Sequence, residues 1–399
     1  MSAARPATPE MFDAVVVGGG PAGATAAADL ARGGHAVLLL DRAGRIKPCG
    51  GAVPPRLLRD FAIPESLLVA RAAAARMVAP SGRTVDMPIA GGFVGMVDRD
   101  HFDEWLRARA AAAGAVRRTG VFERLERAAD GTALVCYRTP EGAAGCIAAR
   151  AVIGADGANS AVARAALPQR RAAPFVFAYH EIVSSPRPDS GFDGARCDVV
   201  YRGALSPDFY GWVFPHGATT SVGVGSARKG FALRAAVAAL RQSAGLADAA
   251  TLRREGAPLP LRPLACWDNG RDVVLAGDAA GVVAPASGEG IYYAMTAGRL
   301  AGEAVAAFCA DGDARALRQA RRRFMRAHGR VFWILGMMQR FWYSSDRRRE
   351  RFVAICQDPD VQRLTWEAYM NKELVRARPG AHARIFFKDL AHLCGFVAP

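Results

Sequence analysis

The sequence has few cysteines for its length, and no two of them have metal-binding spacing. Eight cysteines are spread over 399 residues, and none belongs to a C-x-x-C pair. This absence argues against a structural zinc site and against a thioredoxin-type motif, so we expect no metal. Such sparse cysteines are typical of a protein from a reducing compartment.

Long hydrophobic runs are also missing. There is no 18-residue apolar stretch and no cationic segment followed by an apolar one, so the sequence predicts neither a transmembrane helix nor a secretory leader. No internal repeat is present, which excludes collagen-like and solenoid folds. With 51% hydrophobic residues, the chain can bury a large core in roughly two or three domains. We expect a protein on the cytoplasmic side, either soluble or peripheral to a membrane.

The net charge of +15 is concentrated towards the end of the chain. Residues 315–399 hold 18 Lys and Arg against 7 Asp and Glu, together with 12 aromatic residues. The pattern predicts several helices with breaks at 358–359 and 378–380. Arginines beside aromatic residues are typical of helices on an anionic membrane, but they would also suit a cover over a substrate site. No recognition module for nucleic acid is present, so we expect no nucleic-acid partner.

The first forty residues predict a dinucleotide site. A β-branched run ending at Val17 is followed by Gly-Gly-Gly-Pro-Ala-Gly at 18–23. Gly18 permits a tight turn, Gly20 lets backbone approach a pyrophosphate, and Gly23 lets the next helix pack on the strand. The N–H groups at the start of that helix favour phosphate.

An acid lies at the end of the next predicted strand. Asp41 is placed to accept hydrogen bonds from a ribose diol, which favours FAD or NAD over a 2′-phosphate. We expect Ala22 and Arg42 to contact the same cofactor.

Two later segments narrow the choice of dinucleotide. The strand 272–275 is followed by Gly277 and Asp278, a pattern that resembles the ribityl-binding segment of FAD-dependent hydroxylases. A glycine-rich entry to the next helix would aim N–H groups at the flavin ring. The residues of that entry are Gly288, Gly290 and Ile291.

The third segment contains Asp156 and Gly157 and resembles the Asp-Gly motif of the same flavoproteins. A β-turn between a strand and a helix would explain these two residues equally well. The usual arginine of that motif is shifted to Arg164. Three motifs in this order predict FAD, and no second G-x-G-x-x-G indicates a nicotinamide domain.

Two further motifs resemble the geranylgeranyl reductase family. The segment 45–51 contains Cys49-Gly50-Gly51, and residues 207–215 carry the P-x-x-Y-x-W-x-F-P signature. The resemblance extends over nearly the whole chain. Four segments resemble the branch that acts in chlorophyll and bacteriochlorophyll synthesis: 46–68, 97–106, 268–294 and 358–372.

The resemblance implies an α/β fold with a Rossmann-type FAD-binding domain of the para-hydroxybenzoate hydroxylase type. It also implies an inserted antiparallel-sheet substrate domain and a helical C-terminal region. The expected FAD-binding parts are 11–80, 101–168 and 266–312. The expected substrate parts are 81–100 and 169–265, followed by the C-terminal region 313–399.

The signature also suggests where a prenyl chain would lie. Tyr210, Trp212 and Phe214 alternate along a predicted strand and share one side, and we expect them to bind substrate together with Pro215 and His180. A polyisoprene offers only apolar area, at about 0.8 kcal/mol for each buried CH₂. The alternative is that these aromatic residues only pack in the protein core, and that His180 is a buried core histidine whose ring nitrogens have hydrogen-bond partners.

The resemblance assigns Cys49 and Gly50 to the neighbourhood of the flavin ring. Cys49 and Tyr210 are candidate proton donors, ordered water is another, and an inert buried Cys49 is the alternative reading. By the same resemblance Arg99 would contact the cofactor phosphates. The alternative is that Arg99 stands at the start of a helix with its side chain in solvent and contacts no cofactor.

The family implies an FAD-dependent reductase that saturates three isolated double bonds of a geranylgeranyl chain to phytyl. Its substrate would be geranylgeranyl-(bacterio)chlorophyll, the diphosphate, or both, with NADPH or reduced ferredoxin as electron donor. We expect it at the photosynthetic membrane, in association with pigment-synthesis enzymes. An aromatic hydroxylase or halogenase on the same fold is the rival enzyme, and a flavin-loaded membrane scaffold is the non-enzymatic alternative.

Overall fold

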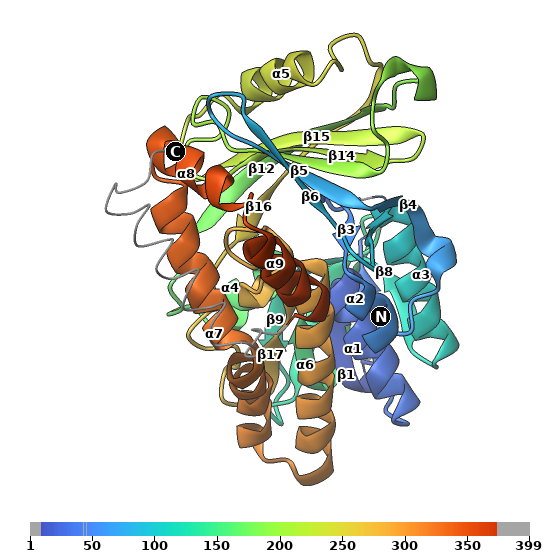
Figure 1. Cartoon of the computed structure of the whole chain (residues 1–399). Coiled ribbons are helices and arrows are strands. Elements are labelled where there is room, and N and C mark those ends of the chain that lie inside the picture. Colours follow the sequence, from blue (N-terminus) through green and yellow to red (C-terminus); the bar gives the residue numbers. More distant parts are fainter. Residues whose placement is uncertain (1–8, 43, 45, 373–399) are drawn as a thin grey trace.

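The computed structural model describes residues 9–42, 44 and 46–372. An α/β part built on one seven-stranded sheet lies below a second seven-stranded sheet, and the C-terminal helices lie along one side of both (Figure 1). The chain passes between the two sheets several times, so neither part is continuous in sequence. This is the predicted class: an α/β fold with an inserted sheet and a helical C-terminal region.

The first sheet has the strand order β8-β2-β1-β11-β10-β9, and β17 also pairs with β11. Its centre is parallel, whereas β9 and β10 are added antiparallel. The apolar residues of β1 and β2 are almost all buried, as expected for strands covered on both faces. The strands are β1 (Met11–Val17), β2 (Val37–Asp41), β8 (Val116–Thr119), β9 (Val121–Arg127), β10 (Ala133–Arg138), β11 (Ala144–Gly154) and β17 (Val273–Leu275).

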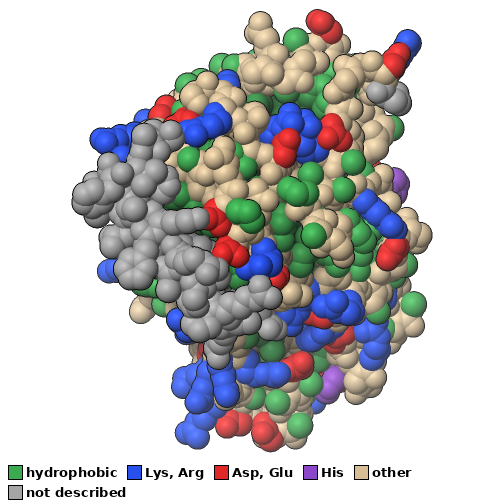
Figure 2. Space-filling view, viewed as in Figure 1, with side chains coloured by type: hydrophobic (Ala, Val, Ile, Leu, Met, Phe, Trp, Pro, Cys, Tyr) green, Lys and Arg blue, Asp and Glu red, His purple; other side chains and the backbone are tan. Residues whose placement is uncertain are grey.

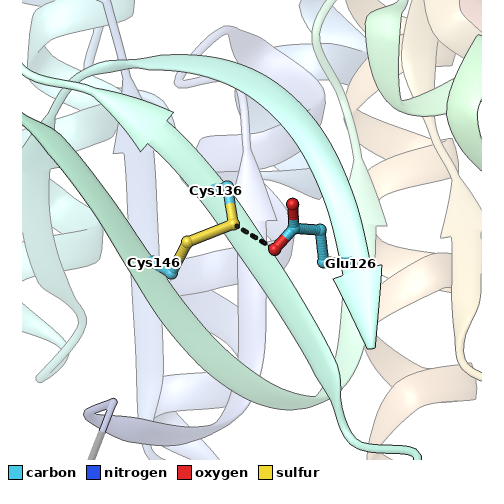
Figure 3. Close-up of side chains that lie close together, drawn as sticks. All are labelled: Glu126, Cys136 and Cys146. Atoms are coloured by element: carbon cyan, nitrogen blue, oxygen red, sulfur yellow. Dashed lines mark hydrogen bonds between the residues drawn. A yellow bond between two sulfur atoms is a disulfide. The ribbon is translucent and has the colours of Figure 1, made fainter. Parts of the chain in front are cut away.

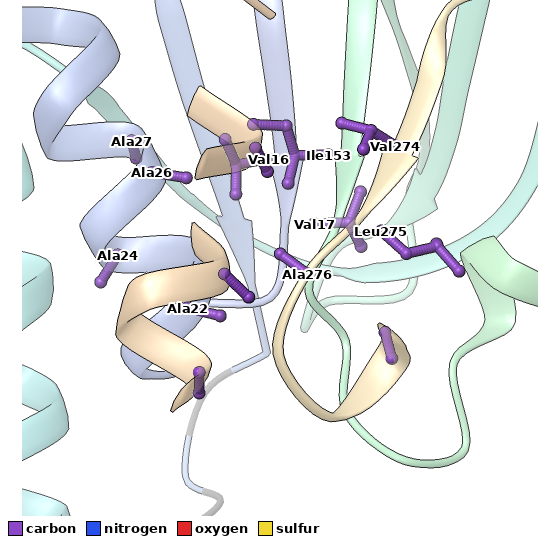
Figure 4. Packing of buried hydrophobic residues seen from close by; sticks show 14 of the residues in the cluster. Val16, Val17, Ala22, Ala24, Ala26, Ala27, Ile153, Val274, Leu275 and Ala276 are labelled. Atoms are coloured by element: carbon purple, nitrogen blue, oxygen red, sulfur yellow. The ribbon is translucent and has the colours of Figure 1, made fainter. Parts of the chain in front are cut away.

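Small residues let two helices pack closely beside this sheet. In Figure 4 the alanines of α1 lie next to Val16 and Ile153. A Cβ atom at Gly298 of α6 would lie 2.1 Å from the carbonyl oxygen of Ala22, so this helix contact requires glycine. The helices of this part are α1 (Pro21–Arg32), α2 (Pro55–Asp60), α3 (Arg99–Ala112), α4 (Ala161–Ala166) and α6 (Ile291–Asp311).

The second sheet has the order β16-β12-β15-β14-β13-β5-β6, and a small sheet has the order β3-β7-β4. Helix α5 (Leu233–Ser243) packs against β12 and β15. The expected division at residue 80 falls after β5, which already pairs with β13 in the second sheet. The strands are β3 (Ala52–Val53), β4 (Leu68–Ala72), β5 (Ala74–Val78), β6 (Thr84–Pro88), β7 (Val94–Val97), β12 (Phe175–Ser184), β13 (Arg196–Val200), β14 (Gly211–His216), β15 (Thr219–Ser226) and β16 (Thr251–Pro260).

The C-terminal region forms α7 (Arg318–Trp342), α8 (Asp346–Ile355) and α9 (Pro359–Asn371). The predicted break at 358–359 is confirmed, because the Asp358 carboxylate caps α9. The predicted break at 378–380 lies outside the described residues. Among the described helices, none combines the length and the apolar character that a membrane crossing needs. Short 3₁₀ turns are η1 (Glu65–Leu67), η2 (Pro188–Ser190), η3 (Gly277–Ala280) and η4 (Ala314–Leu317).

A disulfide joins Cys136 of β10 to Cys146 of β11, two residues that face each other across the antiparallel pair. Figure 3 shows the Glu126 carboxylate of β9 beside it, 3.7 Å from the Cys136 sulfur. Because both sulfurs are bonded to each other, this cluster does not offer thiolate ligands to a metal. Nothing in the cysteine spacing indicated this pairing.

Candidate functional site

The turn between β1 and α1 contains glycines with three different roles. Gly18 has φ +105°, and a Cβ there would lie 2.4 Å from the carbonyl oxygen of Ala155. A Cβ at Gly23 would lie 1.8 Å from the carbonyl oxygen of Gly18, so only a glycine lets α1 pack this closely on the turn. Nothing lies within 4 Å of a Cβ at Gly20, and this residue and Ala22 line a cavity. The turn therefore presents bare backbone to open space.

Asp41 ends β2 beside this turn. A Cβ at Gly19 would lie 2.7 Å from Oδ2 of Asp41, and Nη1 of Arg107 lies 3.4 Å from the same oxygen. Burial raises the pKa of Asp41, although the Gly19 N–H and the Arg107 charge oppose the shift. Arg42 is exposed, and neither Arg42 nor Asp41 is among the residues that line the cavity. Arg107 comes from α3, and no sequence motif indicated it.

The turn after β17 lies against the first glycine turn. Gly277 has φ +62°, and a Cβ there would lie 2.8 Å from the Cβ of Ala22. The Asp278 carboxylate is buried and forms an ion pair with Lys47. Both acids predicted for the cofactor, Asp41 and Asp278, thus lie next to glycine turns. The other predicted residues of this segment also line the cavity: Gly288, Gly290 and Ile291.

Asp156 has a local structural task. Its carboxylate accepts hydrogen bonds from the Ser160 hydroxyl and from the N–H groups of Ala161 and Val162, at the start of α4. Its neighbours Ala155 and Gly157 line the cavity, whereas Asp156 does not. The side chain of Asp156 thus caps a helix, an arrangement that fits the turn between a strand and a helix, and its predicted cofactor contact stays a prediction. The shifted Arg164 is exposed.

The turns open into one cavity of about 760 Å³, lined mostly by apolar residues. Its walls come from the turns after β1, β11 and β17, from the inner face of the second sheet, and from α7, α8 and α9. In Figure 1 these helices lie beside and in front of the space between the two sheets. Cofactor-type turns and an apolar chamber thus share one cavity.

The predicted aromatic strand forms part of this wall. Trp212 and Phe214 of β14 line the cavity, whereas Pro215 points to the opposite face because side chains alternate along a strand. This position gives no support to the predicted substrate contact of Pro215, which stays a prediction. Tyr210 lines the cavity, and its hydroxyl donates to the Ser287 carbonyl oxygen at 2.6 Å. Burial raises the pKa of Tyr210 well above its usual range.

The Cys49-Gly50 segment lies against the aromatic wall. A Cβ at Gly50 would lie 3.1 Å from the Phe214 ring, and Cys49 lines the cavity. The Cys49 sulfur accepts a hydrogen bond from the Gly51 N–H at 3.4 Å and interacts with the side chain of Arg99. This segment therefore brings a thiol to the apolar chamber.

Arg99 is a buried residue at the start of α3. Its guanidinium donates to both carboxylate oxygens of Asp103, at 2.8 and 2.7 Å, and contacts Cys49. Burial alone would lower the pKa of Arg99, but the charge and hydrogen bonds of Asp103, together with the interaction with Cys49, more than reverse this effect. Arg99 lines the cavity, so it is not the solvated arginine of the alternative interpretation.

His180 lines the cavity from β12, with both ring nitrogens engaged. Nδ1 lies 2.9 Å from the Ser221 hydroxyl, and Nε2 lies 3.0 Å from the Glu255 carboxylate. The Trp212 indole N–H donates to the same Ser221 hydroxyl at 3.1 Å. His180 thus fixes the aromatic wall and also contributes to its surface.

The C-terminal helices cover the cavity, an arrangement that the sequence left open as an alternative to membrane contact, whereas sequence reasoning missed an ion pair inside the cavity. Leu335 and Met338 of α7 and Trp366 of α9 close the chamber from the side opposite the sheet. Glu289 and Lys372 form a buried ion pair that also lines it. Glu289 lies between Gly288 and Gly290 of the predicted glycine-rich entry to α6, and this position is the only sequence signal for it.

The site fits FAD. The open space at Gly20 and Gly157, where added Cβ atoms would meet nothing within 4 Å, is suited to a close approach by a dinucleotide backbone. Asp41 and Asp278 supply carboxylate acceptors for hydroxyl groups beside that space. The glycine loop before α6 offers N–H groups to the apolar end of the chamber.

Solved structures share this fold. A geranylgeranyl bacteriochlorophyll reductase-like protein from Thermoplasma acidophilum aligns with a TM-score of 0.80 and 21% identity, covering 95% of this chain and 99% of that one. A flavin-dependent brominase aligns with a TM-score of 0.75 and 17% identity, covering 96% of this chain and 100% of that one. Identities this low establish the architecture alone.

Comparison of sequences establishes the family. A family model described as FAD binding domain matches residues 11–328. The geranylgeranyl diphosphate reductase of Rhodobacter capsulatus is 57% identical over 97% of this chain and 99% of its own length. The chloroplastic enzyme of that name from Oryza sativa is 36% identical over 91% of this chain and 82% of its own length. The chain therefore belongs to the geranylgeranyl reductase family of FAD-binding proteins.

Proposed function

We propose that this protein is an FAD-dependent oxidoreductase that saturates the three isolated double bonds of a geranylgeranyl chain to give phytyl. The observation that carries the proposal is the shared cavity, in which glycine turns of the cofactor type meet an apolar chamber. The family relatives named for geranylgeranyl diphosphate reduction support the same activity. (Bacterio)chlorophyll biosynthesis is the pathway that the resemblance implies.

FAD would be held by the turn at 18–23, by Asp41 and by Asp278, and when bound and reduced it supplies a hydride. Trp212 and Phe214 hold the prenyl chain by apolar contact, and α7 to α9 close the chamber on the side opposite the sheet. Isolated alkenes carry no electron-withdrawing group, so the residues must contribute positioning and a proton. Tyr210 positions the glycine loop through its bond to the Ser287 carbonyl.

The substrate is geranylgeranyl-(bacterio)chlorophyll, geranylgeranyl diphosphate, or both, and the electron donor is NADPH or reduced ferredoxin. An anaerobic assay tests this proposal. Purified enzyme is mixed with NADPH and either prenyl substrate, and the product mass is followed. Successive gains of two hydrogens, up to six, are expected. No gain with either NADPH or dithionite would contradict the proposal, and a product formed only with oxygen would favour the hydroxylase or halogenase alternative.

We also propose that the protein lies on the cytoplasmic side of the photosynthetic membrane as a peripheral protein. One stripe along α7 carries exposed residues at helical spacing, whereas the opposite stripe faces the protein core and the cavity. Two members of the exposed stripe are large apolar residues, Trp333 and Met337, with 67% and 50% of their surface exposed. The other members are Arg322, Arg326, Arg330 and Arg340.

An anionic lipid surface suits this stripe, because arginines attract the headgroups while Trp and Met enter the interface. Figure 2 shows Lys and Arg side chains gathered at the lower left, near the beginning of α7. The inner side of the same helix lines the cavity. Only the thickness of this one helix therefore separates the proposed membrane surface from the site of a membrane-held pigment or prenyl lipid. Association with other pigment-synthesis enzymes on that membrane belongs to the same proposal.

Vesicle sedimentation tests the membrane proposal. The double variant W333S/M337S, and the triple variant R322Q/R326Q/R330Q, should bind anionic vesicles more weakly, the latter by about 1 kcal/mol per arginine. L252S removes an equally exposed apolar residue on β16 and serves as the matched control. Equal binding by all variants, or equal binding to zwitterionic vesicles, would contradict it.

A further inference from the structure

A buried ion pair lies inside the mostly apolar cavity. Glu289 stands between Gly288 and Gly290, in the loop that enters α6, and its carboxylate pairs with the ammonium group of Lys372 at the end of α9. Only 6% of the Glu289 side chain and 3% of the Lys372 side chain are exposed. The pair therefore joins the glycine loop on the cofactor side to the last described helix.

Packing alone does not explain this pair. Enclosing two charges costs several kcal/mol, and attraction offsets the cost only when the remaining polar atoms also find partners. Oε2 of Glu289 contacts Lys372, but Oε1 is buried and has no hydrogen-bond partner among the described residues. Two apolar side chains would fill the same space without this cost. An acid with a free oxygen in the chamber indicates a chemical role.

Other acidic groups of the cavity are less suited to donate a proton. The Tyr210 hydroxyl already donates to a carbonyl, and both His180 ring nitrogens have partners. Burial raises the pKa of Tyr293 and Tyr369 well above the usual tyrosine range, so both hold their protons tightly. The Cys49 sulfur interacts with a buried guanidinium.

The environment makes proton exchange within the pair easy. Burial raises the pKa of Glu289 and lowers the pKa of Lys372, while the charge of each partner opposes the shift of the other. The two values thus approach each other. The Lys372 ammonium also lies 3.7 Å from the ring centre of Tyr369. The titratable or charged groups that act on the pair from the surrounding elements are Tyr210, Tyr293, Tyr369 and Arg56.

We propose that Glu289 is the acid that protonates the alkene, and that Lys372 restores its proton. The inference rests on the proposed reduction, in which one alkene carbon takes a hydride and the other a proton. The O–H bond of Glu289 breaks and leaves its electron pair on the carboxylate, while the new C–H bond uses the electron pair of the former π bond. Lys372 stabilises this carboxylate, passes a proton to it, and is itself reprotonated from water.

Substitution E289Q tests the proposal, because glutamine keeps the size and removes the acid. In FAD-bound enzyme pre-reduced with dithionite, loss of the geranylgeranyl diphosphate double bonds should slow by at least about 100-fold, as expected for a lost general acid. Flavin content and binding of the diphosphate to the oxidised enzyme should not change. E303Q, on the exposed part of the same helix, is the matched control and should keep the wild-type rate.

An infrared titration provides a readout that needs no turnover. Difference spectra of the oxidised, FAD-bound enzyme are recorded as the pH rises, without prenyl substrate. A carboxylic-acid C=O band should disappear at a pH above the ordinary glutamic acid pKa of 4.5, and this band should be missing in E289Q. In K372M the band should persist to higher pH, because the stabilising positive charge is gone.

The double variant E289Q/K372M separates a chemical role from a structural one. It removes both charges, so the cover can close without an unpaired buried charge. We expect it to stay as slow as E289Q. Recovery of the wild-type rate in the double variant, or a wild-type rate in E289Q, would overturn the inference. Failure of the wild-type enzyme to reduce the diphosphate would instead overturn the proposed function.

Discussion

The two ends of the cavity are built by different means. The cofactor end consists mainly of backbone, in turns where Gly18, Gly23 and Gly277 approach other atoms more closely than a side chain allows. The prenyl end consists of side chains from the second sheet and from three C-terminal helices. Backbone turns bind a cofactor through N–H groups whose positions must stay fixed. An apolar wall instead binds through contact area that several side chains contribute, so the loss of one side chain removes only part of it. Substitutions should therefore have sharper effects at the cofactor end.

The largest effect is expected at Gly23. A Cβ there would lie 1.8 Å from the carbonyl oxygen of Gly18, so G23A should displace α1 and destabilise the protein by about 3 kcal/mol, with loss of bound FAD. G20A is the matched control, because its Cβ meets no atom within 4 Å. It should fold normally and bind FAD more weakly. Flavin-to-protein ratios and thermal unfolding measure both effects, and a stable, FAD-loaded G23A would contradict this account.

At the aromatic wall we expect a smaller effect, which concerns binding of the prenyl substrate rather than folding or FAD content. F214A should retain FAD but lose about 1–3 kcal/mol of prenyl-chain burial, which raises KM for the prenyl substrate by about 10- to 100-fold. V213A changes the opposite face of the same strand, which packs towards α5. It should lower stability and leave KM unchanged. Equal KM values in F214A and the wild-type enzyme would show that the prenyl chain does not bind against Phe214.

The smallest effect on the stability of the fold is expected at Asp41, where the direction of the change is informative. Because burial raises the pKa of Asp41 in the folded protein, its ionisation weakens the unloaded fold as the pH rises through that range. D41N should therefore stabilise the FAD-free protein slightly near neutral pH. It should also weaken FAD binding by about 10- to 100-fold, since a charged acceptor for the ribose is lost. Unfolding curves of FAD-free protein and FAD titrations test both directions.

The same contrast explains what could be predicted from the sequence. Local motifs located both glycine turns and both carboxylates, because a turn is encoded by neighbouring residues. The signature at 207–215 located the aromatic strand, but side-chain alternation places Pro215 on its other face. The Asp156 carboxylate caps α4, a local contact that a turn between a strand and a helix explains without a cofactor. The Glu289–Lys372 pair and the contact of Arg107 with Asp41 join distant segments, which no local pattern encodes.

The central claim is that cofactor and prenyl chain react within one cavity. Its most direct test is a single-turnover experiment without oxygen, in which FAD-bound enzyme is fully reduced, freed of reductant and mixed with geranylgeranyl diphosphate. We predict that one flavin is oxidised for each double bond lost, with the absorbance change and the product mass following the same rate. Double bonds lost without flavin oxidation, or flavin oxidised without loss of a double bond, would contradict the claim.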